Sequence, residues 1–164
     1  GLLEPRHAPR PRALSAFADE RAHQRPIATC APSTTVAAMA AFGTGTCPGL
    51  TAMAGYTQLE PASHKLIQLI QFKDALAPKP ANPHIPVPPM VDPLDLQREE
   101  TVFEKLAAQE VRVTSSGLPK FSKSPLTEAA LRGTDYQGNV TPRDRVLAAA
   151  RASRTPPADL PVHP

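Results

Sequence analysis

The chain has 164 residues, of which 21 are proline, and its aromatic residues are 5 Phe and 2 Tyr with no Trp. Many alanines contribute to its hydrophobic share of 41%, and alanine removes little surface from water on burial, so the composition argues against an ordinary self-sufficient domain. The net charge of +3 is low for a ribosomal or RNA-coating protein, and no stretch stays apolar for the roughly 18–20 residues that span a bilayer. We therefore expect no nucleic-acid partner and no transmembrane segment, whereas a peripheral membrane contact stays open.

Residues 1–60 are predicted to form an extended N-terminal segment with one short helix. Prolines among the first twelve residues exclude a helix interior there, and the helix is expected over 13–24, before Pro26. A further helical turn is predicted over 35–42, ahead of several glycines.

Residues 61–77 are predicted to form an amphipathic helix, the most hydrophobic element of the chain. Pro61 is tolerated in a first helical turn, and no helix breaker follows before Pro78. At helical spacing, four apolar side chains would share one face, namely those of Leu66, Leu69, Ile70 and Leu76. We expect this face to bind a partner protein.

Residues 78–93 are predicted to form a polyproline II linker, because prolines recur at every third position: Pro80, Pro83, Pro86 and Pro89. Polyproline II has three residues per turn, so the four rings would form one ridge. At about 3.1 Å per residue the segment would span on the order of 45–50 Å, as a strut or a docking strip. The same PxxP spacing also fits a ligand of an SH3-type groove, with Lys79 as a flanking charge, but we favour the strut.

Residues 94–164 are predicted to contain three short helices and a tail. The first helix begins after the cap formed by Asp92 and Pro93 and runs to about residue 110. Phe103 and Leu106 are expected among its apolar contacts with a partner.

The other two helices each begin at a hydroxyl residue that is followed by proline. One begins after Ser124 and ends at Gly133, and the other begins after Thr141 and runs to about residue 153. Val146 and Leu147 are the predicted contacts of the last helix.

No segment shows the alternation that strands require. Residues 111–114 are too few to nucleate a sheet alone, and residues 135–139 are predicted to form a turn. The predicted fold class is therefore mainly α with extended proline-rich segments. It is non-globular, with short helices joined by polyproline II or irregular linkers and with no sheet. A compact fold with many loop prolines is the alternative.

The residue types that carry chemistry do not form a recognisable site in this sequence. Cys30 and Cys47 match no zinc or cluster spacing, and nothing orients them toward His23 or His64 as a nucleophile and base. The glycine-rich stretch 43–49 lacks the Lys and Ser/Thr that follow in a phosphate-binding loop. We therefore predict no catalytic residue, no cofactor, no metal and no enzymatic activity.

The predicted function is that of a non-catalytic accessory or structural subunit that docks on several protein subunits of one large complex. The first residue is Gly, and the Arg-, Ala- and Ser-containing opening faintly resembles the mature side of an organellar transit peptide. We therefore expect a mitochondrial location, in a respiratory-chain complex or the ATP synthase. The alternatives are a microtubule- or axoneme-associated protein of the cilium, then a mitochondrial ribosomal subunit, then a PxxP-bearing signalling adaptor. The predicted partner-binding residues are Leu66, Leu69, Ile70, Leu76, Pro80, Pro83, Pro86, Pro89, Phe103, Leu106, Val146 and Leu147.

Overall fold

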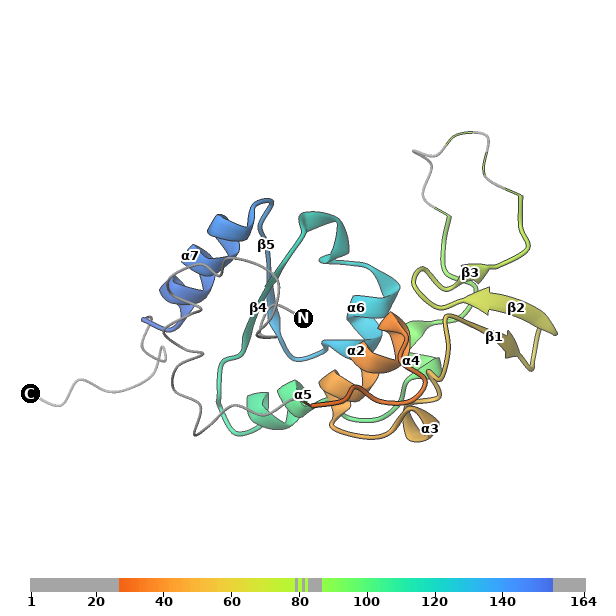
Figure 1. The fold of residues 1–164 in the computed structure, drawn as a ribbon, viewed down its shortest axis with the longest axis horizontal. Coiled ribbons are helices and arrows are strands. Elements are labelled where there is room, and N and C mark those ends of the chain that lie inside the picture. The colour runs from red at the N-terminus through yellow and green to blue at the C-terminus, as the bar shows by residue number, and fades with distance from the viewer. Residues whose placement is uncertain (1–26, 79, 81, 83–86, 155–164) are drawn as a thin grey trace, which may run out of the picture.

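The computed structural model describes residues 27–78, 80, 82 and 87–154 (Figure 1). Its helices are α2 (Thr35–Thr44), α3 (Pro48–Thr51), α4 (Pro93–Leu96), α5 (Val102–Ala107), the 3₁₀ helix η2 (Pro119–Phe121), α6 (Pro125–Ala130) and α7 (Pro142–Ala152). Its strands are β1 (Thr57–Glu60), β2 (Lys65–Gln68), β3 (Lys73–Asp74), β4 (Thr114–Gly117) and β5 (Asp135–Gly138). The helix predicted over 13–24 and the end of the predicted tail lie outside the described residues.

The strands form two small sheets, so the prediction of a mainly α fold without a sheet is wrong. β1, β2 and β3 form an antiparallel sheet in that order, and β4 pairs with β5 in parallel. The described part of the chain therefore mixes helices with strands. The three-stranded sheet lies at one end of this part and α7 lies at the other (Figure 1).

The helix predicted over 61–77 is instead a pair of strands, β2 and β3, that continue a hairpin from β1. Along β2 the side chain of Leu66 is exposed and that of Ile67 is buried, and Leu69 beyond the strand is buried again. This alternation has a period of two, which places one side of a strand in the core and the other in solvent. The apolar residues of this segment fit the spacing of a helix as well as the alternation of a strand. Only the pairing with β1 identifies the segment as a strand.

The turn between β1 and β2 is stabilised by contacts that a continuous helix would lack. The Glu60 carboxylate accepts hydrogen bonds from the backbone N–H groups of Ala62 and Ser63. His64 has a φ of 53°, in the left-handed region. Because a left-handed residue interrupts a right-handed helix, the chain reverses here and returns as β2.

The first predicted helix of the C-terminal part is divided into two helices. Asp92 caps α4 by accepting a 2.8 Å hydrogen bond from the Leu94 N–H, as predicted, but α4 has only 4 residues. Gln97 then takes an extended backbone conformation. Thr101 begins α5 with a capping box that includes Glu104, and this second N-cap explains why the helix does not run through.

β4 begins at Thr114, the last residue of the stretch predicted to be too short for a sheet, and β5 takes the place of the turn predicted over 135–139. Their register pairs Thr114 with Asp135 and Gly117 with Gly138. A parallel pair needs a crossover connection, and here the crossover contains η2 and α6. Strands of 4 mostly polar residues carry little periodic signal, and each finds its partner far along the chain, so the sequence did not indicate the pairing.

The last two predicted helices are confirmed at their N-termini. Ser124 caps α6, and Thr141 caps α7 in a capping box that includes Asp144. α6 ends before Gly133, which takes a left-handed φ of 84° in the turn that follows. The helical turn predicted over 35–42 is part of the longer α2.

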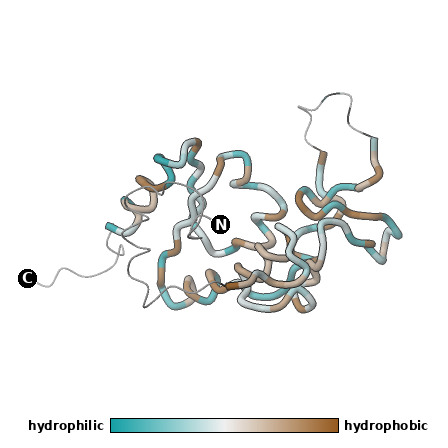
Figure 2. Tube along the Cα trace, viewed as in Figure 1, coloured by the Kyte–Doolittle hydropathy of each residue, from teal (hydrophilic) through white to brown (hydrophobic). Residues whose placement is uncertain are grey.

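One hydrophobic core connects α2, α6 and the three-stranded sheet, so the predicted non-globular arrangement is also wrong. Its largest fully buried apolar side chains are those of Phe72, Met53, Ile67 and Leu69. Alanines fill the contact between α2 and α6, where a Cβ on Gly43 would overlap the Ala130 carbonyl oxygen. Figure 2 shows hydrophobic residues in the sheet region at one end and in α7 at the other.

The chain returns to the three-stranded sheet within the segment predicted to be a proline-rich linker. The Met90 N–H donates a 2.7 Å hydrogen bond to the Phe72 carbonyl, which places residue 90 beside the end of this sheet. A strut between two docking elements would instead hold its ends apart. Pro83 and Pro86 lie outside the described residues, so the predicted ridge of four prolines is not described as a whole.

Candidate protein-binding surface

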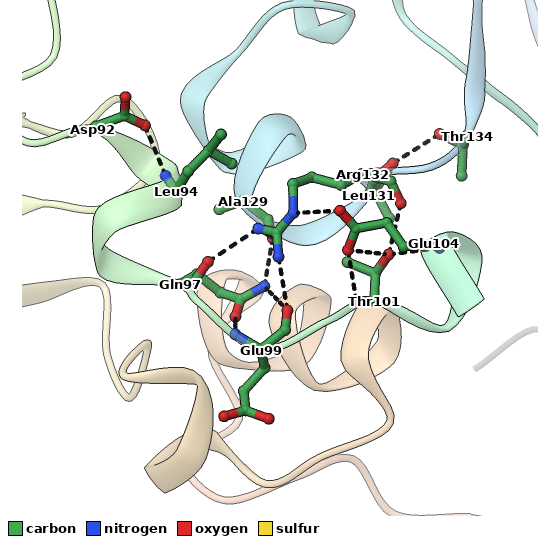
Figure 3. Close-up of polar contacts among 10 residues, drawn as sticks. All are labelled: Asp92, Leu94, Gln97, Glu99, Thr101, Glu104, Ala129, Leu131, Arg132 and Thr134. Carbon is green, nitrogen blue, oxygen red and sulfur yellow. Dashed lines mark hydrogen bonds and ion pairs between the residues drawn. The ribbon is translucent and has the colours of Figure 1, made fainter. Parts of the chain in front are cut away.

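Arg132 is the centre of a polar network that joins the end of α6 to the chain between α4 and α5 (Figure 3). Its Nε donates to the Glu104 carboxylate at 3.0 Å. Its Nη1 donates to the carbonyls of Gln97 at 3.0 Å and Ala129 at 3.2 Å, and its Nη2 donates to the Glu99 carbonyl at 2.7 Å. The guanidinium therefore links separate stretches of backbone.

Glu104 completes the network from the side of α5. Its carboxylate accepts a 2.8 Å hydrogen bond from the Thr101 N–H as well as the bond from Arg132. Partial burial raises the pKa of Glu104, but the hydrogen bonds from Thr101 and Arg132 outweigh burial and leave the pKa below its ordinary value. A carboxylate that is ionised and paired at neutral pH serves as a structural contact rather than as a general acid.

Gln97 is fully buried, and both ends of its amide are used. Its Nε2 donates to the Ala129 carbonyl at 2.8 Å, and its Oε1 accepts from the Glu99 N–H at 2.6 Å. Within the described residues no buried side-chain nitrogen or oxygen lacks a hydrogen-bond partner. The buried polar groups of the network are therefore satisfied within the chain.

An open depression of about 520 Å³ lies beside Arg132, between α4, α6 and β5. The Tyr136 hydroxyl in its lining donates a 2.9 Å hydrogen bond to the Leu118 carbonyl, and burial raises the pKa of Tyr136, so this hydroxyl stays protonated. Asp92 and Glu128 contribute carboxylates to the lining. The depression combines acidic and apolar groups with Arg132 and several hydroxyl side chains.

The reactive residue types give no starting point for a site in the part of the chain that the structure describes. Cys30 and Cys47 are free thiols. Among the described residues, no group of three or more His, Cys, Asp and Glu side chains is placed to hold a metal ion. None of the helices described here has the length and apolar character to cross a membrane.

The outer face of the three-stranded sheet presents exposed apolar side chains instead. Leu59 of β1 and Leu66 of β2 are paired across the strands and are 57% and 39% exposed. Tyr56, directly before β1, is 48% exposed, and its hydroxyl accepts a 2.9 Å hydrogen bond from Gln68. Since Ile67 packs into the core on the opposite face, one face of β2 is packed and the other meets solvent. We call Leu59 and Leu66 the outer sheet face, and the hydroxyl of Tyr56 borders it through its bond to Gln68.

β1 is also an edge strand of this sheet. It pairs with β2 on one side, and the order of the strands leaves its other side without a strand neighbour in the described structure. An edge strand presents backbone N–H and C=O groups to which an extended segment of another protein can add. The outer sheet face therefore offers apolar contact and backbone hydrogen bonding side by side.

The four residues predicted to share one helical face do not lie together. Leu69 is fully buried, and Ile70 packs against the core from a half-buried position. Leu66 lies on the outer sheet face, and Leu76, which is 78% exposed, follows β3. Two of the four are thus part of the protein's own core, and two remain accessible to a partner.

The other predicted contact residues differ in exposure. Pro80 and Pro89 are exposed, while Phe103 and Leu106 are half-buried. The ring of Phe103 lies 6.0 Å from that of Phe42, which is 72% exposed. Among the predicted contacts of the last helix, Val146 is 68% exposed and Leu147 is 42% exposed.

Sequence reasoning missed Tyr56, Leu59 and Phe42 as surface residues. Tyr56 and Leu59 belong to a segment predicted to be extended, and the stretches 56–60 and 65–69 on either side of the turn do not alternate strictly between apolar and polar residues. The sequence therefore gives only a weak hairpin signal here. Phe42 carries no comparable signal, since one aromatic residue on a helix gives no indication of whether it is buried.

No family model, curated protein or solved structure matches this chain. Its function is therefore inferred from the geometry of the described residues.

Proposed function

We propose that this chain is a non-catalytic subunit of a larger protein assembly and that it docks there through the outer sheet face. The observation that supports the proposal is the pair Leu59 and Leu66, two adjacent leucines that are 57% and 39% exposed beside an edge strand. Burying the exposed parts of both side chains would contribute roughly 1.5–3 kcal/mol.

That contribution alone would not hold a complex, because association costs several kcal/mol of lost freedom. The docking site therefore extends beyond the two leucines. Backbone hydrogen bonds to β1 would enlarge the docking site. Contacts with the exposed Leu76, Pro80 and Pro89 would enlarge it further, since these residues come after β3 of the same sheet along the chain. Several weak contacts on one partner give a stable arrangement through effective concentration.

The location proposed for this assembly is the mitochondrion, in a respiratory-chain complex or the ATP synthase. The docking proposal does not depend on this location.

The test replaces Leu59 and Leu66 together by Asp in a tagged chain expressed in its source cell. Both side chains are partly exposed, so the double variant should fold while its docking surface is lost. Leu50→Asp is the matched control, because Leu50 of α3 is 62% exposed and lies outside the sheet. We expect the double variant to migrate as a free chain on a native gel and the Leu50→Asp variant to migrate with the assembly. Assembly of the double variant at the wild-type level would refute docking through this face.

A further inference from the structure

α7 carries a second apolar surface at the opposite end of the described structure from the sheet. Val146 and Leu147 are 68% and 42% exposed, whereas Ala148 on the inner side is 7% exposed and α7 packs against β4. Residues three or four positions apart lie on the same side of a helix, so the exposed pair belongs to a row of side chains along α7 that has an arginine at each end. We call this row the α7 stripe; it consists of Arg143, Val146, Leu147, Ala150 and Arg154.

The segment that carries the α7 stripe is basic. Residues 141–154 contain four Arg against one Asp, which gives a net charge of +3. The ion pairs found among the described residues include neither Arg143 nor Arg154. A partner surface for the stripe should therefore combine apolar side chains with carboxylates.

The depression beside Arg132 has this combination. Asp92 and Glu128 supply carboxylates to its lining, and Leu94 and Leu131 supply apolar side chains. Leu94 is 49% exposed and Leu131 is half-buried. The positive charge of Arg132 is offset by its ion pair with Glu104.

The α7 stripe cannot reach the depression of its own chain, because the β4–β5 sheet lies between them. Gln137 of β5 lines a smaller hollow together with Arg151 and Ala152 of α7, so its side chain points to the α7 side. Tyr136 is the next residue along β5 and lines the depression. Successive side chains of a strand point to opposite faces of a sheet, so α7 and the depression lie on opposite faces.

We propose that the chain associates head to tail with a second copy of itself, the α7 stripe of one copy docking in the depression of the next. Val146 and Leu147 contact Leu94 and Leu131, and the arginines of the stripe face the carboxylates of Asp92 and Glu128. The contact joins two different surfaces, so it is heterologous, and repeating it produces a ring or an open chain of copies. This contact uses neither Leu59 nor Leu66, so its test is independent of the test for docking through the outer sheet face.

The test uses two charge variants of the full chain in analytical ultracentrifugation. Variant A carries Arg143→Glu and Arg154→Glu and has an acidic stripe. Variant B carries Asp92→Asn and Glu128→Lys, and Asn keeps the N-cap of α4 while it removes the charge. The control carries Lys73→Glu and Lys105→Glu. These two substitutions change the net charge by as much as those of variant A do, but they lie outside the stripe. Circular dichroism verifies that each variant folds.

We expect the wild-type chain and the control to sediment faster as their concentration rises, and the association to weaken about tenfold or more when the salt concentration is raised tenfold. Variants A and B should each remain monomeric. Mixing them should restore association, because the basic stripe of B meets the unchanged depression of A.

Three results would overturn the proposal. A wild-type chain that stays monomeric at all concentrations would exclude a second copy as the occupant, which leaves an acidic partner protein or a segment of this chain outside the described residues as the remaining candidates. Association of variant A or B at the wild-type level would show that copies meet through other surfaces. A mixture of A and B that stays monomeric would exclude pairing of the stripe with the depression.

Discussion

Arg132 and Glu104 determine how the C-terminal half of the chain is held against α5. The guanidinium binds the backbone carbonyl of Ala129 on the α6 side and those of Gln97 and Glu99 on the other side. Glu104 both pairs with the guanidinium and closes the capping box of α5. Removing either side chain leaves a partly buried charge without its partner, which costs more than the loss of an exposed ion pair. This polar network therefore stabilises the fold in addition to the small apolar core.

The lowered pKa of Glu104 predicts a pH dependence of stability. A carboxyl group whose folded-state pKa is depressed contributes stability above its unfolded value of 4.5, and this contribution is lost as the pH falls through the folded pKa. Glu104→Gln should therefore lower the free energy of unfolding at neutral pH, and its deficit relative to wild type should shrink below about pH 4.

Urea titrations across this pH range would measure the effect. The control is Glu100→Gln, which changes an exposed carboxylate outside the network. A deficit of the Glu104→Gln variant that stays constant down to pH 3 would contradict the assigned role of Glu104.

At the residue scale, the sequence predicted those features that depend on a few neighbouring positions. The N-caps at Asp92, Ser124 and Thr141 were predicted because each is a short polar residue followed by proline. The capping box of Thr101 and Glu104 has a sequence signature as well, but it was overlooked within the long helix predicted around it. Arg132 had no such signal, because its partners lie about thirty residues away along the chain.

The contact between α2 and α6 depends on Gly43. The helix backbones approach so closely that a Cβ at this position would overlap the Ala130 carbonyl oxygen. In an exposed helix Gly→Ala is stabilising, by roughly 0.5–1 kcal/mol. Gly43→Ala should do the opposite and lower the free energy of unfolding by roughly 1–3 kcal/mol, because a backbone oxygen cannot move aside as a side chain can.

Gly49→Ala is the matched control for this packing prediction. Gly49 belongs to α3, and an added Cβ there would meet no atom within 4 Å. Urea-induced unfolding of both variants would measure the difference. Equal midpoints for Gly43→Ala and wild type would mean that α2 and α6 are not in such close contact.

At the element scale, the strands were the part that sequence reasoning could not recover. Leu66, Ile67 and Leu69 fit an amphipathic helix nearly as well as a strand, and the pairing of β2 with β1 distinguishes the two only in the folded chain. β4 and β5 depend on a parallel partner across a crossover, which no local pattern encodes. The helices with proline at their first position were recovered because their signals are local.

At the scale of the whole molecule, the chain has a core of its own and still exposes apolar groups at both ends. Alanines make up much of this core, so close helix packing substitutes for the large side chains that the composition lacks. The sequence correctly indicated few large buried residues but not that they form one core. Of the candidate surface it identified Leu66 and missed Leu59, because the partner strand was not predicted.

The most direct test of the central claim is the migration of the wild-type chain on native gels of its source cell, followed by mass spectrometry of the gel fractions. We predict that the chain co-migrates with a larger assembly, and that its peak coincides with those of the same partner subunits across the fractions. Migration of the chain as a free species near 17.5 kDa would contradict the account, because a subunit that docks through the outer sheet face should not be found alone.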